Sequence, residues 1–287
     1  MLNDFIRDTI NLIEKSNFEL QFPEIFDTIL EEDNNKKISM EFIDYTGITV
    51  NVKNNFLLIS IILFLLVDTY LDTIYSNIEG QSFKQRYENI DDSDDIDIIF
   101  KEIYRILKLI RNATIHSKSA ITINNNVYTI NYNFRTTNFN LSISKQSFEN
   151  LISLVIFIIN GKNNNTINEY IVSILRTYYR DIKANIIIND EFSNQLLDIN
   201  NTLYLKNMRR YRVLNPRYTI ENNLLSIIPF EIHEVEKSFS GVDYVIDYEN
   251  IKYLLPEETL NDNTISTQDI DKWKYFDLKT ITRPWSQ

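Results

Sequence analysis

Arg111, Asn112 and His116 are the residues of this sequence whose types and spacing best fit a chemical reaction. Asn112 and His116 lie four residues apart and share a helix face, whereas Arg111 lies about 140° round the helix. Its long side chain reaches the same pocket if the last turn unwinds or a second protomer faces it. A histidine with a pKa of about 6.5 exchanges protons at neutral pH, and an arginine binds phosphate through parallel N–H groups. RNA carries its own nucleophile, the 2′-hydroxyl, so these residues fit metal-independent RNA cleavage that leaves a 2′,3′-cyclic phosphate and a 5′-hydroxyl.

Positive charges gather around this motif. Lys108 and Lys118 flank it, and Arg105 precedes it. In a chain with a net charge of −11, this clustering predicts a local anion site at which Lys108 and Lys118 contact RNA. The alternative is structural: a helix C-terminus is stabilised by positive charge, and Arg111 and His116 then only complete a helix.

The composition excludes several other classes of site. The 287 residues include no cysteine, two histidines and four glycines. Zinc ribbons, iron–sulfur clusters, disulfides and multi-histidine metal sites are therefore excluded, and neither GxxxxGK[ST] nor GxGxxG occurs. We expect no metal and no cofactor. The second histidine, His233, lies opposite Phe230 and Ile232 in an alternating pattern and is expected on the solvent-facing side of a strand.

A second basic patch stands out against the acidic background. A net charge of −11 and a pI near 4.8 argue against extensive coating of nucleic acid, because phosphate binding is electrostatic. The stretch between Asp198 and Glu221 nevertheless contains no acidic residue and alternates cations with tyrosines. We predict that Arg209, Arg210 and Arg212 contact RNA there. The alternative is a solvated face, or pairing of these arginines with the protein's own carboxylates.

The first motif is predicted to end a long amphipathic helix. Apolar residues recur at helical spacing from Ile96 to Ile110. Ser93 or Asp94 is expected to cap this helix, and nearby acidic residues favour the positive end of its dipole. A β-hairpin is expected at about 120–144. Further helices are predicted at about 56–78, 145–160 and 166–183.

The ends of the chain have shorter, mixed patterns. Residues 1–55 are predicted to form an α/β preface, with helices at about 2–15 and from Pro23, and a hairpin between Ile38 and Val52. Residues 184–287 are predicted to form a C-terminal α/β portion with a polar tail. The predicted fold class is therefore mainly α: a helical bundle over residues 56–183 with an inserted β-hairpin and α/β additions at both ends.

Two features predict a soluble, cytoplasmic protein that does not bind a membrane. The N-terminus carries the acidic residues Asp4 and Asp8 where a signal peptide has basic residues followed by an apolar run. The longest apolar run extends from Phe56 to Val67, about twelve residues, whereas a membrane span needs about 20.

The arrangement over about residues 56–160 resembles the HEPN (higher eukaryotes and prokaryotes nucleotide-binding) superfamily, whose members are helical bundles with an Arg-x4–6-His motif late in a long helix. The resemblance implies a metal-independent endoribonuclease, usually a homodimer whose two motifs face each other. It gives Arg111, Asn112 and His116 the catalytic roles of the motif. The resemblance rests on the apolar helix at 56–78, the segment 82–88, the acid-capped helix, the Arg111–His116 motif, and the hairpin and helix that follow it.

Two further points follow from the resemblance. An upstream acid often supports the family's site, and Asp68 and Asp72, four residues apart, are candidates; the alternative is a carboxylate pair facing solvent. Toxins of the family that are silenced by a nucleotidyltransferase antitoxin carry a tyrosine two residues after the histidine. Lys118 occupies that position here and argues against this mode of control.

The leading hypothesis is a HEPN-type endoribonuclease that acts as a toxin or antiphage (abortive-infection) effector. His116 is its general acid/base, Arg111 its phosphate clamp and Asn112 its orienting group. The expected partners are RNA, a second copy of the chain, and an antitoxin or regulatory protein. One alternative is a non-catalytic HEPN-like module that binds RNA or a protein. Another is an antitoxin or structural subunit, which fits the acidic pI but explains neither basic patch.

Overall fold

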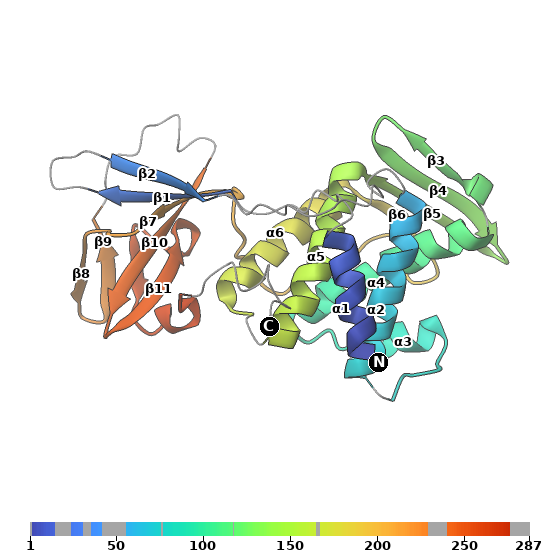
Figure 1. The fold of residues 1–287 in the computed structure, drawn as a ribbon, viewed down its shortest axis with the longest axis horizontal. Helices are drawn as coiled ribbons and strands as arrows, with labels where there is room; N and C mark the ends of the chain where they lie inside the picture. The colour runs from blue at the N-terminus through green and yellow to red at the C-terminus, as the bar shows by residue number, and fades with distance from the viewer. Residues whose placement is uncertain are drawn as a thin grey trace.

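The chain folds into a lobe rich in helices and a lobe of strands, which lie side by side in Figure 1. The helices of the first lobe are α1 (Leu2–Glu14), α2 (Phe56–Ile74), α3 (Phe83–Asn89), α4 (Asp95–His116), α5 (Lys145–Asn164) and α6 (Glu169–Asn185). The computed structural model describes residues 2–14, 24–30, 36–41, 56–75, 77–116, 118–164, 167–228 and 240–275.

Helix α4 is the central element of the helical lobe and packs against α2, α5 and α6. Its apolar face, which includes Ile99 and Ile103, is almost completely buried. The carboxylate of Asp94 accepts the backbone N–H of Asp97 at 2.8 Å, which confirms the predicted cap. Asp95, in the first turn, pairs with Arg176 of α6 at 2.6 Å. The acidic stretch before α4 thus fixes the start of the helix and ties it to α6.

A four-stranded antiparallel sheet adjoins the C-terminal end of α4. The short 3-10 helix η1 (Lys118–Ala120) links the two, and the strands are arranged in the order β3-β4-β5-β6. Asn125 and Asn126 both have positive φ, 49° and 62°, and form the two-residue turn between β3 and β4. The strands are β3 (Ile121–Asn124), β4 (Val127–Phe134), β5 (Thr137–Ser144) and β6 (Ile187–Asn189).

The second lobe contains two more sheets. A five-stranded sheet has the order β11-β10-β7-β1-β2, and a three-stranded sheet has the order β12-β9-β8. The first is formed by β1 (Glu24–Leu30), β2 (Lys36–Glu41), β7 (Arg209–Val213), β10 (Gly241–Tyr248) and β11 (Ile251–Pro256); the second by β8 (Tyr218–Glu221), β9 (Leu224–Ile227) and β12 (Thr264–Ser266).

The predicted fold class, mainly α, is wrong: with three sheets the chain is an α/β fold with substantial sheet. The N-terminal segment does not stand alone, because α1 packs on α2 whereas β1 pairs in parallel with β7. The helix expected from Pro23 is the strand β1. Short apolar runs fit a helix or a strand equally well, and β1 is fixed by partners far along the chain. Part of the hairpin predicted between Ile38 and Val52 lies outside the described residues.

Helix α2 is long and apolar enough to cross a membrane, by length and composition alone. It has 19 residues and a mean hydropathy of 2.1, so the run of about twelve residues seen in the sequence is only its first part. In the structure α2 packs against α1, α4 and α5 and buries Ile59, Leu63 and Leu66. Within the structure, 39% of its apolar 18-residue window is buried.

Candidate active site

The predicted motif lies where α4 leaves the core of the helical lobe. Ile110 is fully buried, Arg111 and Asn112 are half-buried, and His116 is exposed at the last residue of the helix. Within the described part of the chain, His116 makes no hydrogen bond or ion pair. Its imidazole is therefore accessible to a ligand from solvent.

Arg111 is held by an aromatic ring and by its neighbour. Its guanidinium carbon lies 5.6 Å from the ring centroid of Phe64 on α2, a cation–π contact. Its Nη1 donates to Oδ1 of Asn112 at 3.0 Å. No carboxylate among the described residues pairs with Arg111, so its charge and remaining N–H groups are available to an anion.

Tyr132 of the adjacent strand β4 lies beside Asn112. Burial raises the pKa of Tyr132 to about 12, and the neighbouring side chain of Asn112 acts in the opposite direction. The ring of Tyr132 stacks on Phe139 of β5, with centroids 4.9 Å apart and planes 6° apart. Tyr132 and Phe139 thus form an aromatic wall next to the motif.

Tyr132 lies beside the motif although the sequence pattern does not indicate it. The alternating pattern of β4 shows which residues share a face of the sheet, but it does not show that this face meets the end of α4. The pairing of β4 with β5, and the short link from α4 to β3, bring them together. A tyrosine in the hairpin directly after the motif is the only trace in the sequence.

We expect Tyr132→Phe to lower the free energy of unfolding by about 1 kcal/mol, because it removes a half-buried hydroxyl that lies beside the side chain of Asn112. The measurement is urea unfolding followed by circular dichroism. Tyr128→Phe is the matched control: its ring stacks on Phe56 at 3.8 Å, and no described residue is hydrogen-bonded to its hydroxyl. Equal losses in the two variants would contradict a stabilising interaction between Tyr132 and Asn112.

The two cations that precede the motif are neutralised by the segment after β6. Arg105 is 1% exposed, and its Nε and Nη2 donate to the two carboxylate oxygens of Asp190, both at 2.8 Å. Lys108 is buried and pairs with Glu191, and its ammonium lies 4.8 Å from the ring centroid of Phe83. The predicted RNA contact at Lys108 is therefore occupied by an internal ion pair. The side chain of Lys118 lies outside the described part of the structure.

The structure does not bring the candidate supporting acids to the motif. Asp68 and Asp72 both pair with Arg86, and Asp68 also accepts the hydroxyl of Tyr104 at 2.5 Å. Tyr104 precedes His116 by twelve residues of helix, about 18 Å at 1.5 Å per residue. The two carboxylates therefore join α2, α3 and α4 at a distance from the imidazole.

The arginines of the second basic patch lie on β7 and do not share one exposed face. Arg209 is exposed, whereas Arg212 is buried and its guanidinium lies 5.8 Å from the ring centroid of Tyr275. Arg210 is fully buried and pairs with Asp243 and Glu258, both at 2.6 Å. The three arginines do not form a continuous RNA track, because alternate residues of a strand point to opposite faces. The pairing of Arg210 matches the alternative considered from the sequence.

The described residues add no further group to this site. His233 lies outside the described residues, and the described residues contain no group of three His, Asp or Glu side chains placed to hold a metal ion. The site at the end of α4 therefore consists of Arg111, Asn112, His116 and the aromatic residues beside them.

No protein-family model, curated protein or solved structure matches the chain.

Proposed function

We propose that the chain is a metal-independent endoribonuclease of the HEPN type that acts in the cytoplasm as a toxin or antiphage effector. The observation that carries the proposal is that the last two turns of α4 carry both an exposed imidazole, His116, and an arginine that no described carboxylate neutralises, Arg111. Because α4 stays helical to His116, these two side chains lie about 140° apart on one copy of the helix. Both are set at the end of a rigid, buried helix. RNA is the substrate that suits this pair, because it needs a phosphate clamp and a proton carrier but no external nucleophile.

In this reaction a ribose 2′-hydroxyl attacks the adjacent phosphorus, and the bond from phosphorus to the 5′-oxygen of the next nucleotide breaks. An imidazole takes the 2′-hydroxyl proton, and a protonated group returns a proton to the leaving 5′-oxygen. The products are a 2′,3′-cyclic phosphate and a 5′-hydroxyl. Arg111 stabilises the extra negative charge on the phosphoryl oxygens in the transition state, and Asn112 holds its guanidinium in place.

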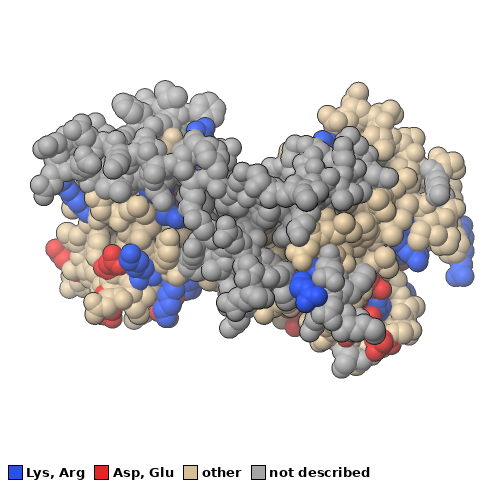
Figure 2. All heavy atoms as spheres, viewed as in Figure 1, with Lys and Arg blue, Asp and Glu red and all other residues tan. Residues whose placement is uncertain are grey.

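The active form we propose is a homodimer. One imidazole is not able to accept a proton and donate another in the same step, and a second copy supplies a second His116. The N-terminal half of α2 lies beside the end of α4, since Phe64 meets Arg111. This half of α2 exposes Leu58 and Leu65, 40% and 47%, which lie seven residues apart on one face. Figure 2 shows that tan, uncharged residues make up most of the described surface of the helical lobe, with Lys, Arg, Asp and Glu in separate small groups.

Leu65→Glu is expected to convert the dimer to a monomer, because a charge buried in an apolar interface is strongly destabilising. Sedimentation velocity at micromolar concentrations measures the change. Ile251→Glu is the matched control, a substitution at an apolar residue of β11 with 40% exposure in the other lobe. A wild-type chain that is monomeric, or a Leu65→Glu variant that stays dimeric, contradicts this interface.

A non-catalytic module that binds RNA or a protein is the second candidate. One observation favours it: Arg105 and Lys108 are neutralised, which leaves fewer cations to bind a phosphate chain. The two candidates are separated by expressing wild type and Arg111→Ala in bacteria and following growth and RNA integrity. The proposed ribonuclease predicts growth arrest and RNA fragments with the wild type alone. Intact RNA with the wild type, together with bound RNA or protein in the purified material, favours the binding module. An antitoxin or regulatory protein is the expected partner of the ribonuclease.

A further inference from the structure

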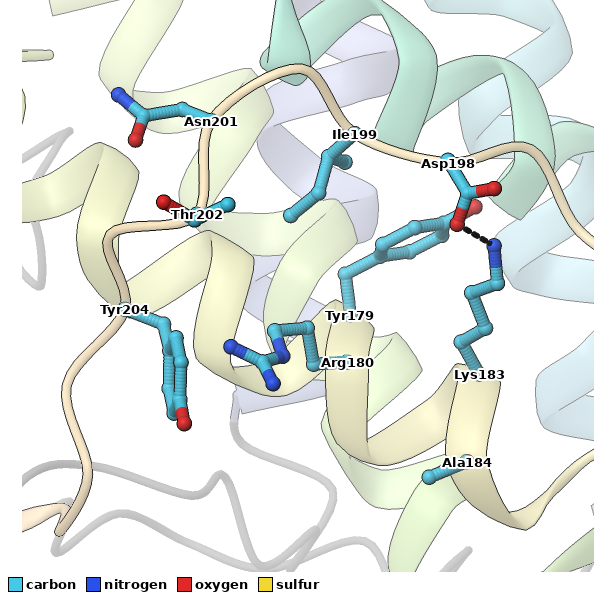
Figure 3. A pocket seen from close by; sticks show the side chains of 9 residues that line it. All are labelled: Tyr179, Arg180, Lys183, Ala184, Asp198, Ile199, Asn201, Thr202 and Tyr204. Atoms are coloured by element: carbon cyan, nitrogen blue, oxygen red, sulfur yellow. Dashed lines mark hydrogen bonds and ion pairs between the residues drawn. The ribbon is translucent and has the colours of Figure 1, made fainter.

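A hollow lies between α6 and the segment that leads to β7, apart from the candidate active site. Its volume is about 630 Å³, within the range of small-molecule sites. Arg180 and Lys183 line one wall from α6, and Asn201, Thr202 and Tyr204 line the other (Figure 3). It shares no residue with the motif at the end of α4, so what it binds is independent of the proposed ribonuclease activity.

Arg180 is the central cation of this hollow. Its guanidinium carbon lies 3.3 Å from the ring centroid of Tyr204, so the planar group rests on the tyrosine. Arg180 makes no hydrogen bond or ion pair with any described residue, although the chain has 40 acidic and 29 basic residues. Arg105, Arg176 and Arg210, in contrast, each pair with carboxylates. The stack fixes the plane of Arg180 and leaves its N–H groups open.

The remaining polar groups make the hollow weakly positive. Lys183, one turn further along α6, donates to the carbonyl of Leu197 at 3.1 Å and to the carboxylate of Asp198 at 2.5 Å. Asp198 is 93% exposed and neutralises Lys183 only at the rim. With Arg180 the lining carries two cations and one carboxylate. Thr202 adds a hydroxyl on the opposite wall, whereas the side chain of Asn201 points outward and its Oδ1 accepts the backbone N–H of Leu203 at 2.8 Å (Figure 3).

We infer that this hollow binds a nucleoside monophosphate unit. The phosphate meets the open N–H edge of Arg180, and the flat base packs on the Arg180–Tyr204 stack and on Ile199. A bare anion leaves most of a 630 Å³ hollow empty, and an uncharged ring leaves Arg180 unpaired. A ligand with both parts satisfies Arg180 and the apolar wall together. The unit is either a free nucleotide or the phosphorylated end of an RNA strand.

The test is calorimetric titration of the full chain with AMP, adenosine, inorganic phosphate and a 5′-phosphorylated oligoadenylate. AMP is expected to bind more tightly than adenosine or phosphate. Arg180→Ala is expected to weaken AMP at least about tenfold through the lost charge-assisted hydrogen bonds. Asp198→Asn is expected to strengthen it about threefold, because it removes a negative charge from the rim of the hollow. An oligonucleotide that binds more tightly than AMP through Arg180 identifies the source as RNA.

Arg135→Ala is the matched control, because Arg135 also rests on an aromatic ring, Phe134 at 5.2 Å, but lies at the tip of the β4–β5 hairpin. It should bind AMP as the wild type does. Circular dichroism of each variant without ligand checks the fold. Three results overturn the inference: AMP affinity unchanged in Arg180→Ala, phosphate as tight as AMP, or adenosine as tight as AMP.

Discussion

His116→Ala is expected to slow RNA cleavage by about 10²–10⁴-fold, the usual contribution of a positioned general acid or base. The imidazole is exposed and is bonded to no other described residue, so the free energy of unfolding should change by less than about 0.5 kcal/mol. Single-turnover cleavage of a labelled RNA gives the rate, and urea unfolding gives the stability.

The control is His233→Ala, the same substitution at the chain's other histidine, which should leave the rate unchanged. Arg111→Lys is a second test, because lysine keeps the positive charge but lacks the planar guanidinium that binds phosphate through two N–H groups. We expect a loss of about tenfold or more for that variant. A His116→Ala variant that cleaves at more than about a tenth of the wild-type rate is incompatible with the assigned role.

Arg210→Ala is expected to lower the free energy of unfolding by about 3–5 kcal/mol, because it leaves two buried carboxylates without their cation. The guanidinium binds Asp243 at 2.6 Å and Glu258 at 2.6 and 2.8 Å, and all three side chains are nearly inaccessible to solvent. Tyr170 of α6 donates to the second oxygen of Asp243 at 2.6 Å, so this ion cluster also joins the two lobes. Urea unfolding monitored by circular dichroism measures the change.

Arg209→Ala is the neighbouring control on the same strand. Arg209 is exposed, and its replacement should change stability by less than about 0.5 kcal/mol. Gly241→Ala probes the same cluster from the backbone, because a Cβ there would collide with the guanidinium of Arg210. If Arg210→Ala and Arg209→Ala cost the same, the buried cluster is not what stabilises the joint between the lobes.

Local sequence patterns located the helices that carry the motif. The periodicity from Ile96 to Ile110, and the acidic residues before it, describe an element that the structure forms as α4, capped by Asp94. Asn125 and Asn126 mark a turn because asparagine tolerates the positive φ that a tight hairpin requires. These features depend on residues close together in the chain.

The errors arose where distant segments meet. Residues 24–30 alone fit a helix, but pairing with β7 makes them a strand. Lys108 and Arg210 looked available to RNA because their carboxylate partners, Glu191 and Glu258, follow about 83 and 48 residues later. Long-range ion pairs leave no periodic trace, so cation clusters in the sequence overstate the charge that a folded protein offers. The position of Tyr132 beside the motif likewise depends on tertiary structure, the pairing of β4 with β5.

The chemistry of the RNA ends made by the purified wild-type chain tests the central claim most directly. RNA of a single sequence is incubated with the chain in EDTA, and DNA of the same sequence is incubated in parallel. The ends of the products are identified by mass spectrometry. The proposed function predicts 2′,3′-cyclic phosphates and 5′-hydroxyls from RNA and no cleavage of DNA, because the 2′-hydroxyl is the nucleophile. Cleavage that needs a divalent cation, that yields 5′-phosphates, or that occurs on DNA would contradict it.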